Sequence, residues 1–218
     1  MQAIERHVDS LDWITLILLT AILLLVIVKS VYPQRYEEFT SLLTSNKFMV
    51  FKGKENNAFH PFNILMFLVN AISVSLFLFI LFRFFSRHEN LSPGILFIRI
   101  FTAYTCFVLL KFSIEKIFAN IFDLDDTIDY YLFQKLSHRN FISLILLIFS
   151  VILVYAVTPT NGILYVGMGF VLLANLLSLI VIYRQNQNLI LGNWFYFILY
   201  LCALEIAPYI ILYKLITT

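Results

Sequence analysis

Six long apolar stretches constrain the fold of this chain more than any other feature of its sequence. A hydrocarbon core about 30 Å thick is crossed by ~20 helical residues at a rise of 1.5 Å per residue. Each stretch meets that requirement, so each is predicted to be a transmembrane helix. The six stretches are residues 13–31, 62–85, 95–122, 141–157, 163–183 and 194–215.

The composition supports a membrane protein. Hydrophobic residues make up 61% and charged residues 13% of the 218 positions, against roughly 45–50% and about 25% in soluble domains. Pro93 and Gly94 punctuate the chain after the second stretch, and Pro159 and Gly162 follow the fourth, as expected for tight turns between antiparallel helices. We therefore predict one all-α domain over residues 1–218, a polytopic membrane helix bundle with six transmembrane helices.

The distribution of Lys and Arg predicts how the bundle is oriented, because cytoplasmic loops carry an excess of these residues. With six spans, both termini lie on the side that carries fewer of them. We therefore expect both termini to face the periplasm. The side that carries fewer has Arg6, Arg83, Arg87 and Lys214, and the other has Lys29, Arg35, Lys47, Lys52, Lys54, Lys116, Lys135, Arg139 and Arg184.

The longest connection, residues 32–61, has apolar residues at helical spacing. Its Tyr36, Phe39 and Leu43 recur beside Glu37 and Lys47, which predicts a short amphipathic helix lying on the cytoplasmic membrane surface. Two interpretations stay open for this helix. It is either a connector resting on the membrane or a docking surface for a partner.

Glu205 is the clearest polar residue within a predicted span, close to the midpoint of the sixth. An ionisable side chain at the bilayer centre costs at least ~2.5–3.5 kcal/mol, so it calls for a partner or a function. Pro208 leaves a backbone carbonyl nearby without its usual donor. In the third span, Lys111 and Glu115 are spaced to pair along one helix.

A Lys111–Glu205 pair between helices would neutralise both charges, and other polar residues lie at similar depth. We predict a polar layer near the middle of the membrane, which either fixes helix packing or carries protons, an ion or a substrate. We expect the long side chain of Arg99 to extend to the nearer membrane surface, where its charge stays in contact with water. The predicted layer comprises Glu205, Lys111, Asn70, Asn175, Glu115 and Arg99.

Signatures of catalysis and of cofactor binding are weak. The D-x-D-x-T string at residues 123–127 resembles a phosphatase nucleophile motif, but that motif needs a preceding strand. The four histidines fall at span ends or in loops and share no ligand spacing. Scattered charges disfavour nucleic-acid binding. We therefore expect no enzyme activity, no catalytic residue, no cofactor, no metal and no nucleic-acid partner.

Two segments carry a resemblance to a known family. They are the loop FTSLLTSNKFMVFKGK (39–54) and the closing span WFYFILYLCALEIAPYIILYKLI (194–216), which contains Glu205 and Pro208. The chain resembles a family of multi-pass inner-membrane proteins from Bacteroidota, known as a domain of unknown function. The resemblance implies a bacterial cytoplasmic membrane and assigns no reaction. By association, it implies a role beside the secretion and gliding machines of these bacteria.

Two functions follow as expectations. The first is a non-enzymatic membrane subunit or assembly factor of a larger cell-envelope complex, concerned with protein secretion or gliding. Its partners would be membrane lipids and other membrane protein subunits. The second is a small transporter or proton-conducting subunit that uses Glu205 and Lys111. The two halves of the chain contain no matching interrupted spans, which disfavours alternating access.

Overall fold

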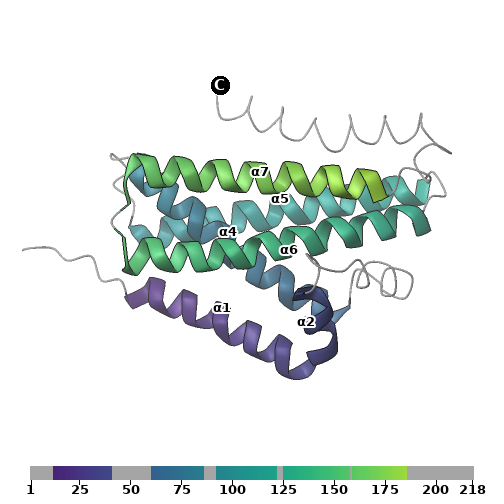
Figure 1. The fold of residues 1–218 in the computed structure, drawn as a ribbon, viewed down its shortest axis with the longest axis horizontal. Coiled ribbons are helices and arrows are strands. Elements are labelled where there is room, and N and C mark those ends of the chain that lie inside the picture. Colours follow the sequence, from purple (N-terminus) through teal and green to yellow (C-terminus); the bar gives the residue numbers. More distant parts are fainter. Residues whose placement is uncertain (1–11, 41–59, 86–91, 122–124, 158, 186–218) are drawn as a thin grey trace, which may run out of the picture.

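The computed structural model describes residues 12–40, 60–85, 92–121, 125–157 and 159–185, and these form six helices and no strand (Figure 1). Proline stands at the first position of three of them, where its missing N–H is not needed. The helices are α1 (Asp12–Val31), α2 (Pro33–Thr40), α4 (Pro61–Phe85), α5 (Pro93–Ile121), α6 (Asp125–Tyr155) and α7 (Asn161–Gln185).

Five of these helices, all except α2, are long and apolar enough to cross a membrane. They occur where the first five transmembrane helices were predicted, and they alternate in direction along the bundle (Figure 1). These helices indicate a membrane protein. The sixth predicted span, residues 194–215, lies outside the described residues.

The prediction for the fourth span was wrong at its start. It began at residue 141, whereas α6 begins at Asp125 and its candidate membrane span begins at Tyr131. A search for apolar runs stops at Gln134, Ser137 and Asn140, because these residues are polar. In the folded chain all three are buried, so polarity here marks the inside of the bundle rather than a loop.

Helix α4 is the centre of the bundle. It packs against α1, α5 and α6, and α6 packs in turn against α7. In Figure 1, α4 runs obliquely behind α6, from the end where α7 begins to the short helix α2. Aromatic rings fill one of its interfaces, where the ring centroids of Trp13 in α1 and Phe79 in α4 are 5.2 Å apart.

The short helix α2 occurs within the segment that was predicted to be amphipathic. Its Phe39 is buried against Val28, Phe62 and Phe133, so this apolar side chain faces the bundle. The rest of the predicted amphipathic segment, residues 41–59, lies outside the described residues. A position of α2 on the membrane surface stays a prediction.

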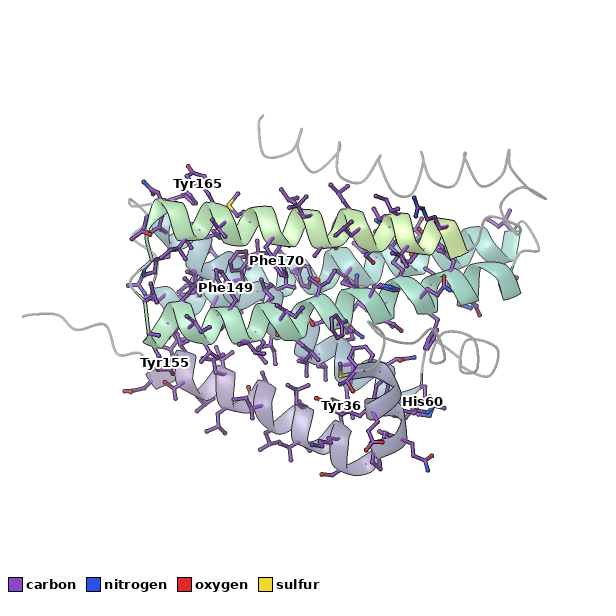
Figure 2. All side chains as sticks on the ribbon, viewed as in Figure 1. Tyr36, His60, Phe149, Tyr155, Tyr165 and Phe170 are labelled. Carbon is purple, nitrogen blue, oxygen red and sulfur yellow. The ribbon has the colours of Figure 1, made fainter. Side chains whose placement is uncertain are left out.

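Helix α7 approaches α6 closely at Gly167. A Cβ atom at this position would lie 2.7 Å from Cε1 of Phe149 and 3.3 Å from Cζ of Phe77. Figure 2 shows Phe149 between α6 and α7. Only glycine fits this contact without displacing an aromatic ring. The ring centroid of Tyr165 on α7 lies 5.8 Å from that of Phe85 in α4.

Candidate functional site

The candidate site is a network of polar side chains where α4, α5 and α6 meet. Helix α6 supplies Lys135 and the backbone oxygen of Arg139, which bond to α5 and α4. Other polar residues recur at helical spacing on α6, and the hydroxyls of Ser137 and Ser143 donate to carbonyl oxygens of α6 itself. Buried polar groups in a membrane protein need partners within the protein, since lipid offers none. The buried polar residues of α6 are Gln134, Ser137, Asn140, Ser143 and Ser150.

Asn70 of α4 joins three helices. Its side chain is completely buried. The amide Nδ2 donates a hydrogen bond to the backbone oxygen of Arg139 in α6, at 3.2 Å. Its Oδ1 accepts a hydrogen bond from the hydroxyl of Tyr104 in α5, at 2.9 Å. One amide therefore sets the register of α4 against both neighbours.

A buried ion pair joins α5 to α6 beside this junction. Lys135 Nζ lies 2.7 Å from Glu115 Oε1, and the side chains are 19% and 3% exposed, so the carboxylate is buried. The same ammonium lies 5.7 Å from the ring centroid of Tyr131. Each charge compensates the other, so removing one partner would leave an uncompensated charge inside the protein.

A second ion pair lies nearer the end of the same two helices. Lys116 Nζ donates to Asp129 Oδ2 at 2.7 Å. Both side chains are 31% exposed. Exposed ion pairs contribute little to stability, because water competes for both charges. This outer pair therefore contrasts with the Glu115–Lys135 pair, whose side chains are less exposed.

Arg139 completes the network on the α4 side. The central carbon of its guanidinium lies 5.9 Å from the ring centroid of Phe67, a cation–π contact. Its Nε is buried and has no hydrogen-bond partner among the described residues. The buried part of this side chain is therefore held by the aromatic ring rather than by a hydrogen bond.

The structure distributes the predicted polar layer unevenly. Asn70 and Glu115 belong to the network, and Lys111 is half-buried on α5. Glu115 forms an ion pair with Lys135 in α6. Its predicted pairing with Lys111 stays a prediction. Arg99 is exposed on α5.

The remaining two members of the predicted layer lie elsewhere. Asn175 is exposed on α7 and donates its Nδ2 hydrogen bond to the carbonyl of Val171 in its own helix, at 2.8 Å. The structure therefore does not bring Asn175 into the network. Glu205 lies outside the described residues, so its predicted pairing with Lys111 stays a prediction.

Sequence reasoning missed Tyr104, Lys135 and Arg139 as members of the network. Lys135 and Arg139 were assigned to a loop because the fourth span was started too late. A signal was present, since Gln134, Ser137 and Asn140 recur every three residues, as on one face of a helix. Tyr104 gave no such signal, because an aromatic residue in an apolar span also occurs in lipid-facing positions.

The chemistry of the network is that of contacts between helices. Its two carboxylates, Glu115 and Asp129, are each held by a lysine of the neighbouring helix. Within the described ranges, no group of three or more His, Cys, Asp and Glu side chains is placed to hold a metal ion. The arrangement joins α4, α5 and α6 through amide, hydroxyl and charged groups.

The described residues are all-helical and include five long apolar helices, three of which meet at a buried polar junction. The family described as "Domain of unknown function (DUF4271)" matches residues 14–216, nearly the whole chain. The chain belongs to this family. No curated protein and no solved structure matches it.

Proposed function

We propose that this protein is a non-enzymatic membrane subunit or assembly factor of a larger bacterial cell-envelope complex. The proposal rests on the bonding partners of three buried polar side chains. Asn70, Glu115 and Lys135 each have a partner on a neighbouring helix of the same bundle. Side chains engaged in this way hold helices in one arrangement, which suits a scaffold.

The outer surface of the bundle supports the same proposal. In the most apolar 18 residues of α5 and of α7, only 11% of positions are buried. Such faces suit lipid tails and the apolar helices of neighbouring membrane proteins. We infer that the exposed face of α5 is where other subunits pack, with lipid filling the remainder.

The proposed location is the inner membrane, with both termini in the periplasm. Lys29, Lys116 and Arg184 stand near the ends of α1, α5 and α7, which lie at one end of the bundle (Figure 1). Arg83 stands in the last turn of α4, at the opposite end. The excess of basic residues favours the first end as the cytoplasmic one.

The bacterial group and the kind of complex rest on the resemblance of residues 39–54 and 194–216 to Bacteroidota inner-membrane proteins. Protein secretion and gliding are the envelope processes proposed on that basis.

Affinity purification of the tagged full chain from its native membrane, in a mild detergent, tests the subunit proposal. We expect at least one other membrane protein at a fixed molar ratio, measured by quantitative mass spectrometry. A tagged unrelated polytopic protein, expressed at the same level, is the control for adventitious binding. A chain recovered alone, both after mild extraction and after chemical cross-linking in the membrane, would contradict the proposal.

A proton-conducting or transport role is the second candidate. The observation that favours it is the Glu115–Lys135 pair, a titratable pair buried one turn from Lys111. Purified protein in liposomes with an internal pH dye measures conduction directly. Proton flux that is lost in Glu205→Gln, without loss of folded protein, would support this candidate over the scaffold.

A further inference from the structure

Asn175 is an exposed amide in the middle of an apolar helix. It lies ten residues before the end of α7 at Gln185, a depth of ~15 Å at 1.5 Å per residue. Its neighbours Leu172, Leu176 and Leu179 are apolar and exposed, and Ser178, one turn later, is half-buried. A polar group at this depth calls for a partner within the protein, because lipid tails offer no hydrogen bonds.

The side-chain amide of Asn175 uses only one of its hydrogen-bonding groups in the contacts of α7. Within the described residues, its hydrogen bond runs from Nδ2 to the carbonyl of Val171, one turn earlier. The side-chain oxygen Oδ1 and the second N–H of the amide remain available on the exposed side. A partner with one O–H donor and one carbonyl acceptor would complement these two groups.

The chain continues for 33 residues beyond α7, and they include the sixth predicted span, residues 194–215. That span is 22 residues long and would extend ~33 Å as a helix. Eight residues, 186–193, connect it to α7. A connection this short joins antiparallel neighbours, so the span would return along α7.

The depths of the two polar residues agree. Glu205 lies eleven residues after the start of the predicted span at Trp194, a depth of ~16 Å from the same end of the bundle. Asn175 lies at ~15 Å from that end. If the two segments pack antiparallel, Glu205 and Asn175 therefore lie at the same depth.

We propose that residues 194–215 pack antiparallel on the exposed face of α7, with the carboxyl group of Glu205 against the carboxamide of Asn175. A protonated carboxyl group would complement this amide, because it offers one donor and one acceptor. Its O–H donates to Asn175 Oδ1, and its carbonyl accepts from Asn175 Nδ2. This inference concerns the assembly of the chain itself and does not depend on the proposed function.

Disulfide cross-linking in native membranes tests the contact. In a Cys106→Ser, Cys202→Ser background, the pair Asn175→Cys with Glu205→Cys should form an intramolecular disulfide on mild oxidation. The pair Leu179→Cys with Leu201→Cys, one turn closer to the connection, should do so too. We expect at least about tenfold more cross-link than for Ile22→Cys with Glu205→Cys, because disulfides need Cβ atoms about 4 Å apart. Ile22 is exposed on α1 at a similar depth.

Each other outcome overturns the proposal. A cross-link in the pair Lys111→Cys with Glu205→Cys, and not with position 175, would place Glu205 beside α5. A disulfide that doubles the molecular mass would show that a second copy covers α7. The Leu179/Leu201 pair retains both polar residues, so it tests the packing even if the loss of Asn175 or Glu205 prevents folding. Absence of a cross-link in both α7 pairs of folded protein would show that lipid or another subunit covers the face.

Discussion

Helices α4 and α7 have the same length, 25 residues, and both are apolar enough to span a membrane, yet they occupy opposite environments. In the most apolar 18 residues, 56% of positions are buried in α4 and 11% in α7. The buried side of α4 contains Asn63, Asn70, Ser73 and Ser75. Because lipid is as apolar as leucine, polar and small residues mark the interior better than hydrophobicity does.

The largest expected difference comes from one substitution made in both helices. Leu76→Ala in α4 removes a completely buried side chain, and we expect it to lower the free energy of unfolding by about 2–3 kcal/mol. Leu177→Ala in α7 removes a side chain that is 62% exposed and should change it by less than about 0.5 kcal/mol. Unfolding titrations in mixed micelles measure both. Equal losses would show that α7 is as tightly packed as α4.

The two ion pairs between α5 and α6 offer a second test of interior against surface. Lys135→Met leaves the carboxylate of Glu115 buried without its cation, so we expect a loss of about 2 kcal/mol in the free energy of unfolding. Lys116→Met breaks the exposed pair and should cost less than about 1 kcal/mol. The same titrations compare the two variants. A larger loss for Lys116→Met than for Lys135→Met would mean that the outer pair contributes more to the packing of α5 against α6.

Glycines on α7 separate its packed side from its exposed side. Gly167→Ala would push a methyl group into Phe149, and we expect it to cost about 1–2 kcal/mol. Gly169→Ala meets no atom within 4 Å and should be neutral or slightly stabilising, because alanine favours helices. Thermal denaturation of the two purified variants checks the contrast. A stable Gly167→Ala variant would indicate that α7 shifts freely along α6.

The smallest expected effect concerns the Asn70 junction. Tyr104→Phe removes one hydrogen bond to Asn70 Oδ1 and should cost about 0.6 kcal/mol, a typical value for a polar contact between membrane helices. Asn70→Leu also breaks the bond to Arg139 and should cost about twice as much. A double variant no worse than Asn70→Leu alone would confirm that Tyr104 acts through Asn70.

Much of the architecture was predictable from the chain. The five apolar helices occur where apolar runs of the required length occur, since a helix satisfies its own backbone in lipid. The exception is α6, whose first half is polar and was assigned to a loop. The candidate site was predicted less well: Asn70 and Glu115 stand in the network, whereas their partners Tyr104, Lys135 and Arg139 went unrecognised.

The sequence by itself determined that the chain forms apolar helices long enough to cross a bilayer, because helix length and side-chain hydrophobicity are local properties. Only the tertiary structure decided which polar residues meet. Glu115 bonds to Lys135, twenty positions away on the neighbouring helix, and Asn175 stays outside the network that Asn70 joins. The reason is that pairing between helices depends on how they cross and rotate, and that geometry arises only when the whole bundle packs.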